Sequence, residues 1–147
     1  MFYISIDGQI KNKKAVHNFV NDVLYHFFKN RMKRDIDVNV RIRKLLPDND
    51  MGLCDGDADE VNIDLAKGYW NEFGEYALYD YDELIITLAH ELTHAKQFIR
   101  GEMNPYDGVW RSTHTRVNGN RMKYENLPWE KEAFKNQEIL YETYWNK

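Results

Sequence analysis

Alternation of hydrophobic and polar residues predicts β-strands in the first half of the chain. From Ile36 to Arg43 every second side chain is aliphatic and the others are charged or amide, which is typical of a strand with one buried face. The same period of two occurs at Phe2–Ile6, before an Asp-Gly turn, and again at Glu60–Leu65. A further short strand is predicted around Met51–Cys54. These segments therefore predict a small β-sheet in the N-terminal part of the chain.

Hydrophobic spacings of three and four predict three helices. Asn12 can cap the first helix, and Asp80 can cap a second helix that extends from about Tyr81 to Arg100 and stops at Gly101. Pro128 is expected in the first turn of the last helix. The core positions of the second helix are Leu84, Leu88, Leu92, Ala95 and Ile99.

One connecting segment precedes the second helix in the sequence and another follows it. The segment from Tyr69 to Tyr81 is aromatic, and we expect it to be chiefly core, with part of it available to line a cleft. The segment from Gly101 to Leu127 is rich in Gly, Asn and Arg and is expected to be a loop. His17 and His26, in the first helix, are interpreted as structural.

Length and composition fit one domain covering residues 1–147. Hydrophobic residues make up 43% and charged residues 30%, a globular balance, and a net charge of −4 with no basic stripe argues against nucleic-acid binding. Cys54 is the single cysteine, so an internal disulfide and a cysteine-based zinc site are both excluded. Without an evident signal peptide or membrane-length apolar run, we expect a cytoplasmic protein (in the host cytoplasm if phage-encoded). No pattern indicates an oligomeric state.

The acidic segment from Asp48 to Asp59 superficially resembles a calcium-binding loop. Counting from Asp55, position six is Glu60 instead of glycine and position twelve is Ala66 instead of glutamate. We therefore interpret this segment as a solvated acidic hairpin.

The second helix contains an HExxH motif, formed by His90, Glu91 and His94. One turn separates the two histidines, so both imidazoles leave the same face and can bind one metal ion. Glu91 lies about 100° further around the helix, beside the metal, where it can polarise a metal-bound water. This pattern indicates zinc-dependent hydrolysis, most simply of a peptide bond. The alternative interpretation is that His90 and His94 are ordinary histidines on the helix surface and bind no metal ion.

A catalytic zinc ion usually has three protein ligands and one open position. The metzincin pattern would require histidine at position 100, which is Arg100, and a glutamate nineteen residues after His94 is also missing, because that residue is Thr113. Glu130 is favoured because it shares a helix face with Ala133. Glu132 points about 160° away from Glu130, so only one of the two can bind the metal. The full set of candidates is Glu102, His114, Glu125, Glu130 and Glu132.

The segment HELTHAKQFIRGEM, followed later by Tyr124-Glu125-Asn126-Leu127-Pro128-Trp129-Glu130-Lys131-Glu132-Ala133, resembles small phage-type and bacterial gluzincin-like metallopeptidases. The resemblance covers roughly residues 60–140. It implies an α+β, minimal zincin-like fold, with an N-terminal helix, a small, mostly antiparallel twisted sheet, the HExxH helix and a C-terminal glutamate helix. It also implies that His90 and His94 bind one zinc ion, with Glu130 as third ligand and Glu132 as the alternative.

In this interpretation Glu91 is the general base and a peptide or protein is the substrate. A donor to the tetrahedral oxyanion would come from Tyr124 or His114, with Arg111 and Arg116 as weaker candidates. Glu60–Leu65 is expected to be the sheet edge along which a peptide lies. Two alternatives remain: an SprT-type, nucleic-acid-associated protease with His114 as third ligand, and a non-catalytic zinc-binding interaction domain.

Overall fold

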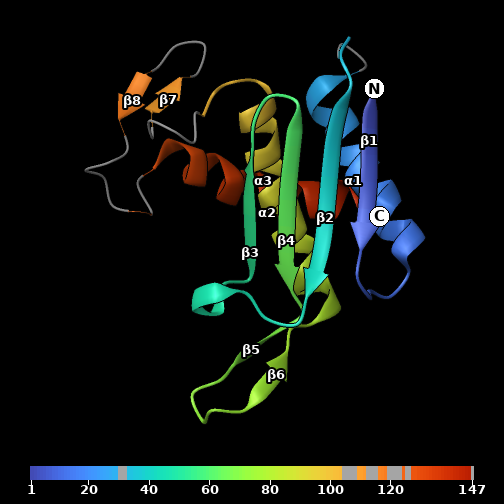
Figure 1. Ribbon diagram of the computed structural model, residues 1–147, viewed down its shortest axis with the longest axis vertical. Helices are drawn as coiled ribbons and strands as arrows, with labels where there is room; N and C mark the ends of the chain where they lie inside the picture. Colours follow the sequence, from blue (N-terminus) through green and yellow to red (C-terminus); the bar gives the residue numbers. More distant parts are fainter. Residues whose placement is uncertain (30–32, 104–108, 112–115, 119–123, 125–126, 147) are drawn as a thin grey trace.

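A computed structural model describes residues 1–29, 33–103, 109–111, 116–118, 124 and 127–146. Its centre is a four-stranded sheet with the order β1-β2-β4-β3 (Figure 1). The strands are β1 (Phe2–Asp7), β2 (Ile36–Arg43), β3 (Gly52–Gly56) and β4 (Glu60–Ala66). The alternating segments of the sequence are thus confirmed as strands. A 3-10 turn at Pro47–Asn49 precedes β3.

The sheet is mixed, so the expectation of a mostly antiparallel sheet is wrong. β1 pairs with β2 and β2 pairs with β4 in parallel, and only β3 and β4 are antiparallel. Helix α1 (Lys13–Phe28) connects β1 to β2 and returns the chain to the same end of the sheet, as parallel neighbours require. The segment that contains β3 makes the equivalent return between β2 and β4.

The position of the sheet edge also differs from the prediction. β4, which was expected at the edge, lies inside the sheet between β2 and β3. β3 is the edge strand, because β4 is its only partner in the described part of the sheet. Alternation in a sequence shows which face of a strand is buried, and it does not show which strands are its neighbours.

The hydrophobic core lies between the sheet and the helices. Val38, Val40, Val61 and Ile63 are fully buried on the helix side. Polar side chains pair on the opposite face, where Arg41 binds Asp64 with Nε–Oδ1 at 2.7 Å and neighbouring asparagines hydrogen-bond to each other. This face is consequently suited to solvent contact.

Helix α2 (Tyr81–Ile99) packs on the sheet along β3 and β4, and helix α3 (Pro128–Tyr144) packs against α2. In Figure 1 all three helices lie behind the sheet. Because α2 has neighbours on both sides, every residue from Leu88 to Ile99 is buried. The sequence predicted only one core stripe on this helix.

The ends of the helices follow the sequence signals in part. The side chain of Asn12 accepts a hydrogen bond from the Ala15 amide, as predicted for a cap. Asp80 is the N-cap residue of α2, but its side chain makes no cap hydrogen bond. Gly101 ends α2 in the left-handed region, with φ +71°, as expected for a C-terminal stop. His26 has a structural contact, since its Nδ1 lies 2.7 Å from the Tyr144 hydroxyl.

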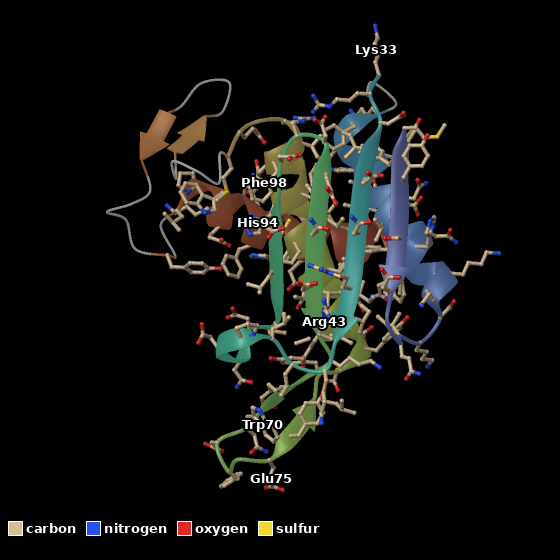
Figure 2. The ribbon with its side chains drawn as sticks, in the orientation of Figure 1. Lys33, Arg43, Trp70, Glu75, His94 and Phe98 are labelled. Carbon is tan, nitrogen blue, oxygen red and sulfur yellow. The ribbon has the colours of Figure 1, made fainter. Side chains whose placement is uncertain are left out.

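The aromatic segment before α2 forms a two-stranded hairpin, β5 (Gly68–Trp70) and β6 (Tyr76–Leu78). The hairpin extends beyond the end of the sheet, with Trp70 and Glu75 far from the HExxH motif (Figure 2). Trp70 is 51% and Phe73 is 77% exposed, so the prediction that this segment is chiefly core is wrong. A second small hairpin pairs β7 (Val109–Arg111) with β8 (Arg116–Asn118). No helix in the described ranges is both long and apolar enough to cross a membrane.

Candidate metal centre

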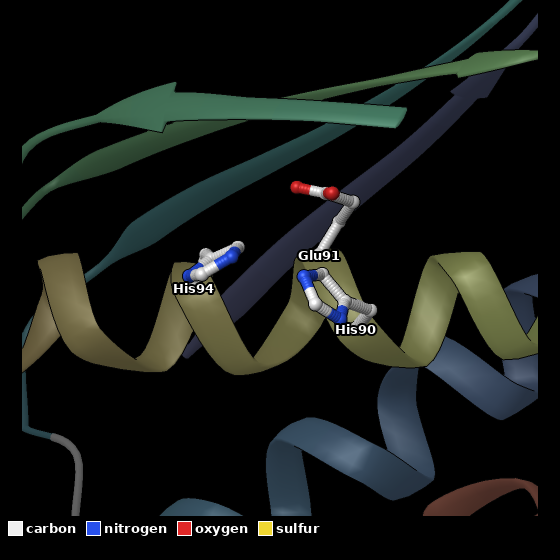
Figure 3. Close-up of side chains that lie close together, drawn as sticks. All are labelled: His90, Glu91 and His94. Atoms are coloured by element: carbon white, nitrogen blue, oxygen red, sulfur yellow. The ribbon is translucent and has the colours of Figure 1, made fainter. Parts of the chain in front are cut away.

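Helix α2 brings the three residues of the HExxH motif together in the interior. His90 and His94 are each 8% exposed and Glu91 is 6% exposed. One donor atom from each of the three residues lies within 4.8 Å of the others (Figure 3). Because the histidines are one helical turn apart, their side chains project from the same face. This buried group could hold a metal ion.

Glu130, in the first turn of α3, reaches the same group. Its Oε1 lies 3.0 Å from Nε2 of His90 and 3.1 Å from Nε2 of His94, and the residue is 6% exposed. The inward position of Glu130 follows from the packing of α3 on α2, with Ala133 fully buried one turn later. The acid favoured by helical geometry is therefore the one that meets both imidazoles.

Two glutamines hold the other nitrogen atoms of the histidine rings. Nδ1 of His90 lies 2.8 Å from Oε1 of Gln137, and Nδ1 of His94 lies 2.8 Å from Oε1 of Gln97. Nε2 of Gln97 donates to the carbonyl oxygen of Trp129 at 2.9 Å, which fixes the orientation of this amide. Nε2 of Gln137 lies 3.5 Å from Oε1 of Glu138, which favours the same orientation for that amide. In these orientations each Nδ1 donates its hydrogen to a glutamine oxygen. Neutral rings would consequently present lone pairs at Nε2.

The donor atoms thus fit a bound cation. In neutral rings of this tautomer, two Nε2 lone pairs face the carboxylate oxygen of Glu130 with nothing to offset their repulsion. A buried arrangement of this kind is stable only when a proton or a metal ion lies between the acceptors. The two glutamines and the packing of α3 hold the acceptors in place, so this geometry favours a metal ion.

The pKa shifts of His94 and Glu130 also favour a bound cation. Burial raises the pKa of Glu130, but hydrogen bonds from His90 and His94 outweigh burial and lower this pKa to about 2. Burial lowers the pKa of His94, but its hydrogen bond to Glu130 and the nearby Glu91 outweigh burial and raise this pKa. The centre therefore stabilises positive charge between the histidines and the acid.

Glu91 differs from Glu130 in its hydrogen-bond partners. The Glu91 carboxylate has no hydrogen bond or ion pair in the described structure, although the residue is almost completely buried. Burial raises its pKa, and the nearby His94 and His90 partly oppose this shift. In Figure 3 its carboxylate points from α2 toward the sheet. Glu91 is therefore a base held next to the centre without a structural partner.

Tyr124, one of the predicted oxyanion donors, lies next to the centre. It is 59% exposed and hydrogen-bonds to Glu130. Burial of the hydroxyl, with the nearby Glu130 charge, raises its pKa, so the hydroxyl keeps its proton. The other candidate, His114, lies outside the described residues, as does Glu125. Arg111 and Arg116 lie opposite each other on strands β7 and β8.

The remaining acidic candidates make other contacts. Oε1 of Glu132 lies 2.8 Å from Nζ of Lys96 and 3.1 Å from Nε2 of Gln97. Glu102 also pairs with Lys96, at 2.7 Å. Among the described acids, Glu130 is thus the one from α3 that contacts both Nε2 atoms.

A cavity of about 460 Å³ opens beside the centre. His90 and Glu91 form part of its wall, together with Gly52 of the edge strand. A β-carbon on Gly52 would lie 3.0 Å from Cγ of Glu91 and 2.9 Å from Cγ2 of Thr87. The full lining is Asp50, Met51, Gly52, Glu83, Ile86, Thr87, His90, Glu91, Tyr124, Phe134, Gln137 and Glu138.

Sequence reasoning did not assign roles to Gln97, Gln137 and Gly52. The two glutamines occur three residues after His94 and seven after Glu130, so each shares a helix face with a candidate ligand. The signal for Gly52 is a glycine inside a predicted strand, which often marks a close approach of another group.

Comparisons of the chain with protein-family models, with curated proteins and with solved structures found no match. The resemblance to gluzincin-like metallopeptidases therefore stays a prediction from the two sequence motifs.

Proposed function

We propose that the protein is a zinc-dependent metallopeptidase of the gluzincin-like type. The observation that supports this most directly is the convergence of three donor atoms: Nε2 of His90, Nε2 of His94 and Oε1 of Glu130. An unpartnered carboxylate, Glu91, lies beside them and borders the cavity.

Zinc fits this donor set in chemistry and in spacing. Two imidazole nitrogens and one carboxylate oxygen are a common catalytic zinc set, which leaves a fourth position open. In a tetrahedral site with bonds of about 2.0–2.1 Å, neighbouring ligand atoms are about 3.3 Å apart. The distances of 3.0 and 3.1 Å between Glu130 and the two rings are close to this spacing. A bound zinc ion supplies Lewis acidity, which lowers the pKa of water and polarises a carbonyl group.

Glu91 is suited to transfer protons. Its raised pKa brings it closer to the neutral range, where a general base works best. In peptide hydrolysis Glu91 accepts a proton from the attacking water and passes it to the amine of the leaving peptide. Its freedom from structural partners leaves both carboxylate oxygens available for these steps.

Tyr124 is suited to donate a hydrogen bond to the developing oxyanion. Its hydroxyl is next to Glu130, it borders the cavity, and its raised pKa keeps it protonated. The edge strand β3 supplies a place for the substrate backbone. Among the described strands only β4 pairs with it, so an extended peptide could add as a further strand along its outer edge.

Two alternatives are less well supported. An SprT-type protease would need His114 as third ligand, but Glu130 already occupies the position next to both Nε2 atoms. A non-catalytic zinc-binding domain has no use for a buried base, and no described residue forms a hydrogen bond or ion pair with the Glu91 carboxylate that would explain its burial.

Zinc content and peptide hydrolysis test this proposal. We expect one tightly held zinc ion per chain after purification without added metal, and we expect the His94→Ala variant to lose it. The zinc-loaded protein should cleave a mixed peptide library, and Glu91→Gln should not. A protein that takes up no zinc, or whose zinc-loaded form cleaves no peptide, would contradict the proposal.

A further inference from the structure

The lining of the cavity beside the centre combines carboxylates with apolar side chains. Asp50, Glu83 and Glu138 contribute carboxylates that are separate from the metal-binding group. None of the described lining residues is lysine or arginine. Asp50 and Glu83 form no ion pair or side-chain hydrogen bond through their carboxylates in the described structure. The cavity therefore presents negative charge that the described residues leave unpaired.

The apolar part of the lining begins at a candidate metal ligand. The ring of Phe134 lies 4.7 Å from the ring of His90, edge to face. Phe134 is 50% exposed, so this aromatic surface is open to a ligand. Met51 and Ile86 extend the apolar surface. A side chain that enters the cavity can therefore contact both apolar surface and carboxylates.

The cavity is also connected to the reactive group. Glu91 is more than nine-tenths buried, its carboxylate has no hydrogen bond or ion pair with a described residue, and it forms part of the same lining. A ligand that fills the cavity is consequently in contact with the proposed base. This is the relationship expected of a subsite next to a scissile bond.

We propose that the cavity binds a lysine or arginine side chain of the substrate peptide. These side chains combine an apolar stem with a cationic head, which matches a lining that contains both apolar side chains and carboxylates. Asp50, Glu83 and Glu138 bind the cationic head, and Met51, Ile86 and Phe134 contact the stem. This inference rests on the proposed peptidase function and specifies its substrate class.

Peptide pairs that differ at one position test the inference. Each position around the scissile bond is occupied in turn by lysine, by methionine as a neutral analogue and by glutamate. At one position we expect kcat/KM to be about tenfold higher for lysine than for methionine, which is reasonable for a few partly exposed ion pairs. Glutamate should give the lowest value there.

Variants that remove the carboxylates of the cavity test whether the preference for lysine arises there. The triple variant Asp50→Asn, Glu83→Gln, Glu138→Gln should lower the lysine-to-methionine ratio toward one. Glu75→Gln, at the distant hairpin, is the matched control and should keep the ratio of the unmodified protein (Figure 2). If the protein hydrolyses peptides without preferring lysine or arginine, the substrate inference is wrong. The inference is also wrong if the triple variant keeps the preference. Neither result would contradict the proposed peptidase function. Absence of all hydrolysis overturns the proposed function.

A second inference comes from the buried contacts behind His94. Gln97 is fully buried, and its Nε2 donates to Trp129 and to Oε1 of Glu132. Lys96 is 6% exposed and binds two carboxylates, that of Glu132 at 2.8 Å and that of Glu102 at 2.7 Å. Only the carboxylate of Glu132 accepts a hydrogen bond from the Gln97 amide in the described structure, whereas Glu102 contacts Gln97 through its own backbone amide. The two acids thus provide equivalent charge to Lys96 and differ in their link to the metal centre.

We infer that Glu132 is a positioning residue for the metal centre. Lys96 fixes the Glu132 carboxylate, the carboxylate holds the Gln97 amide, and the amide orients the His94 ring. Groups that orient a ligand histidine commonly change metal affinity by about 10–100-fold when they are removed. Glu132 would thus raise the affinity for zinc without being a zinc ligand.

The comparison of Glu132→Ala with Glu102→Ala tests this second inference. Both variants remove one carboxylate from Lys96, so a role limited to stability predicts similar zinc affinities. We expect Glu132→Ala to weaken zinc binding at least about tenfold, as measured by competition with a chromophoric chelator, and Glu102→Ala to change it less than about threefold. Glu132→Gln should restore affinity because its amide oxygen can accept from Gln97.

Equal affinities for the two alanine variants, or no rescue by Glu132→Gln, overturn the positioning role. If Glu132→Ala does not fold, Gln97→Met must show the same loss of zinc affinity, because it removes the amide and keeps the length of the side chain. An unmodified protein without zinc affinity overturns the proposed function instead.

Discussion

Gly52 lies so close to Glu91 that a side chain at position 52 would press against the Glu91 side chain. A β-carbon at this position would lie 3.0 Å from Cγ of Glu91 and 3.3 Å from its Oε1. The edge strand can therefore pass directly beside the proposed base because it has no side chain there. This relationship joins the sheet edge, the cavity and the HExxH helix in one site.

The Gly52→Ala variant should displace the Glu91 side chain. Its nearest neighbours would be Cγ2 of Thr87 and Cγ of Glu91, both in side chains that can move, so the fold should persist. We expect kcat/KM for peptide hydrolysis to fall at least about tenfold, because small misplacements of a catalytic group have large effects. Zinc content and the thermal transition serve as controls. Unchanged hydrolysis would show that Glu91 does not depend on the contact.

The Glu91→Gln variant should separate proton transfer from metal binding. Glutamine has nearly the same shape but is not a base, so hydrolysis should fall about 10²–10⁴-fold. Zinc content should stay at one ion per chain, because the proposed ligands are His90, His94 and Glu130. Loss of zinc from this variant would mean that Glu91 is itself a ligand.

The Glu130→Ala variant should lose most of the zinc affinity and some stability of the zinc-loaded protein. Removal of a ligand leaves two imidazoles, and zinc binding to the native state is linked to folding. Chelator competition should show a larger loss for Glu130→Ala than for Glu132→Ala. If His114→Ala is instead the variant that releases zinc, the protein belongs with the three-histidine group.

Acid should destabilise the metal-free protein through Glu130. The pKa of this carboxyl is lowered in the folded state from an ordinary value of 4.5 to about 2. A lowered pKa stabilises the fold above pH 4.5, and this contribution disappears as the pH falls from about 4.5 to about 2. Urea midpoints of the metal-free protein should fall across this range, and they should fall less in Glu130→Gln. Equal pH dependence for both proteins would contradict the assignment.

Local spacing was enough to predict much of the candidate site. The separation of His90 and His94 by one turn depends only on helix geometry, and Pro128 correctly marks the first turn of α3. The inward face that includes Ala133 also identified Glu130. The placement of these side chains could be predicted because each prediction concerns residues within a single helix, and their role as zinc ligands stays a prediction.

Relationships between distant elements could not be predicted in the same way. The alternation in Glu60–Leu65 shows one buried face, but the strand lies inside the sheet because of how β2 and β3 pair with it. The contact of Gln137 with His90 depends on how α3 crosses α2. The exposure of Trp70 arises because the hairpin extends beyond the sheet, although its composition is typical of a core.

The three proposed zinc ligands come from two helices, α2 and α3, that a long segment separates in sequence. Since Cys54 is the single cysteine, the chain cannot join these helices by an internal disulfide. An ion bound by His90, His94 and Glu130 would act as a reversible cross-link between them. Closing so long a loop restricts the unfolded chain considerably. Zinc would then determine how firmly the C-terminal helix is attached to the rest of the protein.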